Sequence, residues 1–106
     1  MSPTPFPSVP SPVEILRRLI QFDTTNPPGY TDTCIHYIQG LLTQAGIETQ
    51  IFAKQPRQPN LVARLPGRGT APPFLMYGHV HVDVVTTENQ TWRYPPFAGE
   101  VAEGFV

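Results

Sequence analysis

Cysteine is almost absent from this chain, and that scarcity limits its covalent chemistry. Cys34 is the only cysteine among 106 residues. No intramolecular disulfide can form, which fits a reducing compartment. Cys34 falls on the expected apolar face of a helix, so the sequence predicts a small core residue rather than a nucleophile.

Long apolar runs and a surplus of charge are also missing. No run approaches the roughly 20 residues needed to span a bilayer, and the N-terminus lacks the basic and apolar regions of a secretion signal. The formal net charge is -1, which gives no reason to expect nucleic acid or an anionic membrane as a partner. We therefore expect a cytoplasmic, globular protein with one domain.

Proline, by contrast, is abundant, and its distribution is uneven. The chain has 14 prolines, and those in the first twelve residues are Pro3, Pro5, Pro7, Pro10 and Pro12. Such a stretch favours an extended polyproline conformation. Residues 1–11 are predicted to be a flexible leader and residues 12–106 the folded domain.

Two helices are predicted next. In Ser11-Pro12-Val13-Glu14, a hydroxyl at the N-cap, a proline at the first helical position and a carboxylate at the third form a capping box. An apolar helical stripe follows, and Asn26-Pro27-Pro28-Gly29 ends it with a turn. The second helix is expected from about Asp32 to Ala45, with Gly46 in the left-handed position past its end.

The period of the apolar residues then changes to that of strands. Residues 47–53 and 60–65 alternate apolar and polar, which indicates two half-buried strands. Phe74-Leu75-Met76-Tyr77 is apolar on both faces and runs into a valine-rich continuation ending at Val85, which is typical of a strand buried in the middle of a sheet. The order of elements predicts an α/β fold of two helices followed by a mixed sheet with a buried central strand.

Three polar residues lie at the far end of that buried strand. His79, His81 and Asp83 share one face of it, because side chains alternate along a strand. Ligands of open α/β sheets bind beyond the carboxyl ends of strands. Imidazole suits zinc, and a ligating histidine usually donates its second N–H to a carboxylate. The pattern is short, and an alternative explanation is that these are simply three polar residues at the end of a strand, without a metal-binding role.

The surrounding segments make the pattern more specific. They are Thr25-Asn26-Pro27-Pro28-Gly29, Asn60-Leu61-Val62-Ala63-Arg64-Leu65-Pro66-Gly67, Asp83-Val84-Val85, Trp92, Pro95-Pro96-Phe97 and Glu103-Gly104-Phe105-Val106. From Pro12 onward, the set resembles the N-terminal region of the dinuclear zinc metallopeptidase and deacylase family. This family includes aminoacylase, acetylornithine deacetylase, succinyl-diaminopimelate desuccinylase and glutamate carboxypeptidase. The resemblance implies a zinc-exopeptidase-like catalytic domain that hydrolyses peptides or N-acyl amino acids.

The resemblance also assigns roles to particular residues. It implies that His81 is a zinc ligand and that Asp83 is the catalytic carboxylate that orients and polarises the site. Trp92 and Pro95 to Phe97 match a loop near the site, although aromatic packing would explain them equally well. The implied cofactor is zinc, with two ions in the intact enzyme, and cobalt is a possible substitute.

One departure from the family pattern concerns which histidine binds the metal. The family has one histidine after the glycine, whereas His79-Val80 here precedes a second His-Val pair. Two inserted residues keep every side chain on its face but displace one flank by ~6.6 Å along the strand. Alignment on Gly78 would make His79 the ligand. Alignment on the longer match from Asp83 to Phe97 makes His81 the ligand, and we prefer it.

A second departure concerns the end of the chain. The family's remaining metal ligands and its general base would follow Val106, so we expect a catalytic domain truncated at the C-terminus. Such a chain should be inactive alone, hold at most one weak zinc site and self-associate through exposed sheet edges. Glu103-Gly104 is expected to form a hairpin turn.

Two other functions remain open at this stage. His79-x-His81 followed by Asp83 also resembles the histidine pair of cyclic amidohydrolases, although the two preceding helices and the Trp92 to Phe97 segment fit that class poorly. The other alternative is a non-catalytic binding module or pseudo-enzyme.

Overall fold

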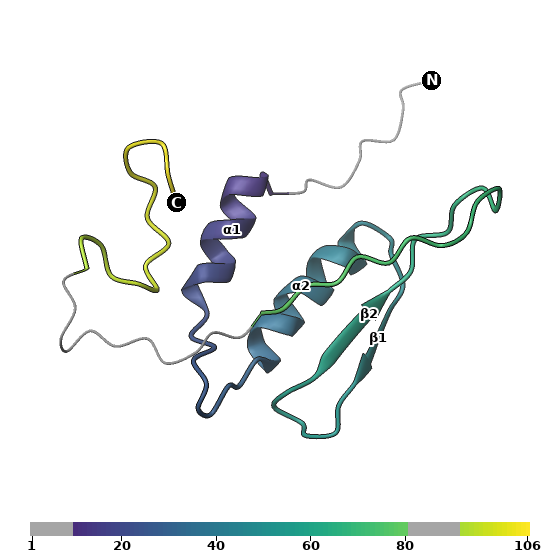
Figure 1. Ribbon diagram of the computed structural model, residues 1–106, viewed down its shortest axis with the longest axis horizontal. Coiled ribbons are helices and arrows are strands. Elements are labelled where there is room, and N and C mark those ends of the chain that lie inside the picture. Colours follow the sequence, from purple (N-terminus) through teal and green to yellow (C-terminus); the bar gives the residue numbers. More distant parts are fainter. Residues whose placement is uncertain (1–9, 81–91) are drawn as a thin grey trace.

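The computed structural model describes residues 10–80 and 92–106. Its regular elements are α1 (Pro12–Gln21), α2 (Asp32–Gln44), β1 (Thr49–Phe52) and β2 (Asn60–Ala63), in that order (Figure 1). The predicted α/β class is therefore confirmed. Within the described residues, neither helix is long and apolar enough to cross a membrane. Most of the proline-rich leader, residues 1–9, lies outside the description.

The start of α1 follows the local sequence. Ser11 is the N-cap, and its hydroxyl accepts a hydrogen bond from the backbone N–H of Glu14 at 3.2 Å, while Pro12 opens the first turn. This confirms the Ser11 half of the predicted capping box. The Glu14 carboxylate accepts a hydrogen bond from Arg17 Nη1 at 3.0 Å, a partner that the sequence pattern did not indicate. The helix ends at Gln21, ahead of the Asn26–Gly29 turn.

The second helix ends as the sequence predicts. Gly46 has a φ of +77°, which suits a residue without a Cβ. Its N–H donates to the carbonyl of Thr43 at 3.0 Å, and the N–H of Ile47 donates to the carbonyl of Leu42 at 2.9 Å. These bonds satisfy carbonyls at the end of α2 and turn the chain toward β1.

The two strands form an antiparallel hairpin that packs against α2. The register pairs Thr49 with Ala63 and Phe52 with Asn60, and α2 contacts both strands. The strands were expected at residues 47–53 and 60–65, and each is shorter by a few residues. Cys34 and Ile35 are buried apolar side chains of α2, and Pro59, which directly precedes β2, is buried as well. The predicted core role of Cys34 is confirmed.

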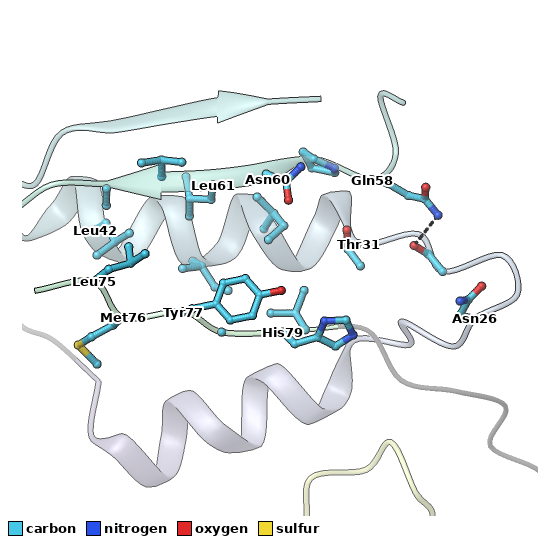
Figure 2. A pocket seen from close by; sticks show the side chains of 18 residues that line it. Asn26, Thr31, Leu42, Gln58, Asn60, Leu61, Leu75, Met76, Tyr77 and His79 are labelled. Carbon is cyan, nitrogen blue, oxygen red and sulfur yellow. Dashed lines mark hydrogen bonds between the residues drawn. The ribbon is translucent and has the colours of Figure 1, made fainter. Parts of the chain in front are cut away.

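The buried central strand of the expected mixed sheet is not confirmed. The sheet of the described residues has two antiparallel strands, and Phe74, Leu75, Met76 and Tyr77 are 84–88% exposed. Figure 2 shows Leu75 pointing toward Leu42 of α2 and Met76 pointing away from it, as side chains do along an extended backbone. Residues 74–77 nevertheless belong to no strand. A strand is buried only when neighbouring strands pair with it and helices cover it. Here a cavity separates the segment from β2.

The C-terminal hairpin turn is confirmed. Ala102 and Phe105 exchange two backbone hydrogen bonds, each 2.9 Å long, and Glu103 and Gly104 have φ values of 55° and 82°. Two positive φ values in a two-residue loop are the mark of a type I′ turn. Arg93 pairs with the carboxylate of Glu103, with 2.9 Å between Nη2 and Oε1.

The segment before this hairpin lies against α1. Arg17 Nε donates to the carbonyl of Gly99 at 2.8 Å, and Gln21 Nε2 donates to that of Ala98 at 3.2 Å. Gly99 is buried, with a φ of +65°. A Cβ at this position would lie 2.6 Å from the backbone oxygen of Arg17. The approach of these two backbones therefore requires glycine.

We predict opposite effects for two glycine-to-alanine substitutions. Gly99→Ala should lower the free energy of unfolding by about 1–3 kcal/mol, because it adds a clash and a strained φ. Gly40→Ala should raise it by up to about 1 kcal/mol, because Gly40 lies inside α2 with open space around it. Urea unfolding followed by circular dichroism measures both. Equal effects of the two substitutions would contradict the close approach of Gly99 to α1.

Candidate functional site

The predicted zinc ligand and catalytic carboxylate are not placed by the structure. His81 and Asp83 lie outside the described residues, so their roles stay predictions. The described part of the histidine segment ends with His79 and Val80, where His79 is exposed and Val80 is half-buried. The structure therefore describes the site only through the surroundings of His79 and Val80.

A large cavity lies on one side of this segment. Its volume is about 890 Å³, and it lies between α2, β2 and residues 75–80. Figure 2 shows Leu42 and Leu61 on the α2 and β2 side, with Tyr77 and His79 opposite them. The outer edge of β2, which β1 does not pair, borders this space.

A smaller cavity of about 350 Å³ lies between α1, the start of α2 and the two chain segments that flank residues 81–91. Its lining residues are mostly apolar: Leu19, Ile20, Phe22, Thr24, Cys34, His79, Val80, Trp92, Pro96 and Phe97. His79 lines both cavities. The structure therefore brings Trp92, Pro96 and Phe97 to the same cavity as His79 and Val80.

Thr24 is a residue of this region that the sequence analysis did not single out. It is buried at 5% exposure, and its hydroxyl donates to the carbonyl of Val80 at 2.9 Å. Next to it, the hydroxyl and then the backbone N–H of Thr25 hold the pKa of Asp23 below its usual value by hydrogen bonding to the carboxylate. A hydroxyl residue just before a turn is too common in proteins for the sequence alone to have revealed this contact.

The donor atoms of the histidine segment fit zinc chemically, but the described residues do not complete a site. Imidazole nitrogens and a carboxylate are zinc ligands, and structural or catalytic sites use three or four of them. In residues 10–80 and 92–106, no three histidine, cysteine, aspartate or glutamate side chains gather in one place. A zinc site with three protein ligands would therefore need at least one ligand from residues 81–91, which contain His81, Asp83 and Glu88.

Cys34 lies in the wall of the smaller cavity but is protected. Burial raises the pKa of its thiol, and the nearby Arg18 guanidinium offsets the rise only in part. The Arg18 guanidinium lies over the rings of Phe22 at 4.2 Å and Tyr37 at 5.6 Å. The thiol is thus a poor nucleophile and a weak metal ligand in the folded chain.

Comparison with known proteins reveals several relatives. The chain is 34% identical over 101 residues to a succinyl-diaminopimelate desuccinylase of Methylorubrum extorquens, which covers 91% of this chain and 25% of that enzyme. It is 34% identical to the desuccinylase of Psychrobacter arcticus, covering 71% of this chain and 20% of that enzyme. It is also 29% identical to an N-formyl-4-amino-5-aminomethyl-2-methylpyrimidine deformylase of Bacillus subtilis, over 80% of this chain and 20% of the enzyme.

These relatives define a class of protein, the deacylating hydrolases, since each carries a desuccinylase or deformylase name. More particularly, the chain belongs to the zinc metallopeptidase and deacylase family that contains succinyl-diaminopimelate desuccinylase. It spans about a quarter of the length of the relatives it matches. No protein-family model matches the chain, and no solved structure does either.

The protection of Cys34 leads to a prediction. At pH 8 the thiol of the native chain should react with iodoacetamide at least about tenfold more slowly than that of the unfolded chain, because burial blocks access and disfavours the thiolate. Mass spectrometry of samples quenched over time, with and without urea, measures both rates. Equal rates in the two conditions would place Cys34 outside the core.

Proposed function

We propose that this chain forms part of the catalytic domain of a zinc-dependent amide hydrolase of the peptidase or N-acyl amino acid deacylase type. The observation that carries the proposal is the similarity to desuccinylases over 91% of the chain, in an aligned length that includes the His79-to-Asp83 motif. The relatives above are named as desuccinylases and deformylases. These names favour the proposed class over the alternative of a cyclic amidohydrolase.

In this proposal the chain contributes one histidine ligand and one orienting carboxylate. His81 would bind a zinc ion, and Asp83 would accept a hydrogen bond from its imidazole, which fixes the tautomer and the orientation of the ring. Zinc in such a site supplies Lewis-acid chemistry that polarises the carbonyl of the scissile amide. The substrate would be a peptide or an N-acyl amino acid, and the remaining ligands and the general base would come from residues outside this sequence.

The wider surroundings of the site agree with this assignment. Trp92, Pro96 and Phe97 form an apolar wall beside His79 and Val80. A water-poor wall next to a metal ligand strengthens the electrostatic interactions at the site. The proposal therefore gives these residues a role in shaping the site, not in the chemistry itself.

The assignment of the ligand can be tested with zinc titrations of the 106-residue chain by calorimetry. His81→Ala should weaken zinc binding by at least about tenfold, and Asp83→Asn by about tenfold, as is usual for a ligand and its orienting partner. His79→Ala is the matched control and should change the dissociation constant by less than about threefold. The reverse order of the two histidines would make His79 the ligand. No binding by the unmodified chain would count against the proposal itself.

We also propose that residues 74–85 form the buried central strand of the intact catalytic domain. The apolar residues Phe74 to Tyr77 are exposed here, and the cavity of about 890 Å³ beside β2 has room for this segment to approach the strand edge. Within the described residues no strand pairs with the outer edge of β2, and in a complete sheet further strands and helices would cover both this edge and the exposed apolar segment. In the chain as it stands they are surfaces for self-association.

Self-association is therefore a prediction for the chain in solution. Sedimentation velocity should show an average mass that rises with protein concentration. A double variant, Leu75→Lys with Tyr77→Lys, should shift the population toward monomer. Phe105→Lys is the control, because Phe105 is 76% exposed but lies outside the segment. A monodisperse monomer for the unmodified chain would contradict the prediction.

A further inference from the structure

One hydrogen bond joins the histidine segment to a distant part of the chain. The hydroxyl of Thr24 donates to the backbone carbonyl of Val80 at 2.9 Å, across 56 residues of sequence. Thr24 is 5% exposed and Val80 is half-buried, so water competes little for the hydroxyl of Thr24, and the loss of this hydrogen bond would leave that buried hydroxyl without its partner.

The turn that carries Thr24 is itself held in place. The carbonyl of Thr25 accepts from the N–H of Gly29 at 2.8 Å. From the β1–β2 connection, Gln58 Nε2 donates to the carbonyls of Pro28 at 3.0 Å and Gly29 at 3.3 Å. The backbone N–H of Thr31 donates to the carbonyl of Arg57 at 2.9 Å. Thr24 therefore directly precedes a turn that hydrogen bonds join to the β1–β2 connection.

Thr24 and Thr31, on either side of this turn, are both buried. Thr31 is 5% exposed, and the Arg57 guanidinium lies 3.9 Å from the centre of the Tyr30 ring while pairing with Asp32 at 3.5 Å. These contacts bind the turn to the hairpin side of the molecule. The position of the Thr24 hydroxyl is thus set by the fold and not by the histidine segment.

We propose that Thr24 is a positioning residue for the metal-binding histidine. The carbonyl carbon of Val80 is bonded to the nitrogen of His81, so a hydrogen bond to that carbonyl restrains the described residue that directly precedes the predicted ligand. The same bond fixes the backbone of Val80 between the two cavities and holds His79 at their boundary. The part of this inference that concerns zinc rests on the proposed function.

A purely structural role would have different consequences. If Thr24 only satisfied a buried polar group, its loss would lower stability without changing the geometry of the histidine segment. A positioning role requires that the loss of the hydroxyl disturb Val80 and His79 and weaken zinc binding in a chain that remains folded. It also requires that serine, which keeps the hydroxyl, restore both.

The experiment compares Thr24→Val, Thr24→Ser and the control Thr33→Val in the full 106-residue chain. Valine keeps the shape of threonine but cannot donate, and Thr33 is an exposed residue of α2. Without metal, nuclear magnetic resonance records the carbonyl ¹³C shift of Val80 and the imidazole shifts of His79. Calorimetry then records the zinc dissociation constant.

Thr24→Val should move the Val80 and His79 resonances and raise the zinc dissociation constant about fivefold or more, the usual effect of losing one hydrogen bond. Thr24→Ser and Thr33→Val should stay within about twofold of the unmodified chain. If Thr24→Val does not fold, Thr24→Ala replaces it under the same criteria. Unmoved resonances would overturn the proposal, and so would moved resonances with an unchanged zinc constant.

Failure of the proposed function gives a different result. In that case the unmodified chain does not bind zinc, and the resonances alone decide the positioning role. A His79 shift that Thr24→Val moves and Thr24→Ser restores would support it, and a His79 shift unaffected by either substitution would overturn it.

Discussion

The shortage of buried apolar surface is the constraint on which the rest of this structure depends. Among the described residues, the buried apolar side chains are Cys34 and Ile35 of α2 and Pro59, which directly precedes β2. A core this small contributes only a few kcal/mol, so the other segments must be held by specific polar contacts. Those contacts are the ones between Arg17 and Gly99, Gln21 and Ala98, Thr24 and Val80, and Gln58 and the turn before α2. Each joins backbone carbonyls to side chains that the helices and loops hold in position.

Local signals in the sequence predicted much of the fold, because they act within a few residues. The Ser11 cap, the left-handed Gly46 and the Glu103–Gly104 turn all depend on neighbours in the chain, and all three are present. The buried strand predicted at Phe74 to Tyr77 is not confirmed, because its apolar pattern shows only that it can be buried. Whether it is buried depends on partners distant in sequence, and within the described residues no strand pairs with the outer edge of β2.

The candidate site was predictable to a similar extent. The histidine motif and its flanking segments were sufficient to identify the family, which the comparisons then established. They could not identify Thr24, because its contact with Val80 spans 56 residues and depends on the path of the chain through α2 and the hairpin. The alternation of side chains does not separate His79 from His81, because both alignments keep the two side chains on the same face of the strand, and the preference for His81 depends on the longer match from Asp83 to Phe97.

Residues 69–71 form an exposed bend directly after Arg68, and this bend has a consequence for the covalent integrity of the molecule. Arg68 and Gly69 are exposed, and a bond between such residues is the kind that proteases cut first. A single cut there would separate residues 1–68 from residues 69–106. The two pieces would still share the hydrogen bonds that join α1 and Thr24 to the later segment. Nicking would therefore turn an intramolecular fold into a complex of two fragments, whose integrity would depend on concentration.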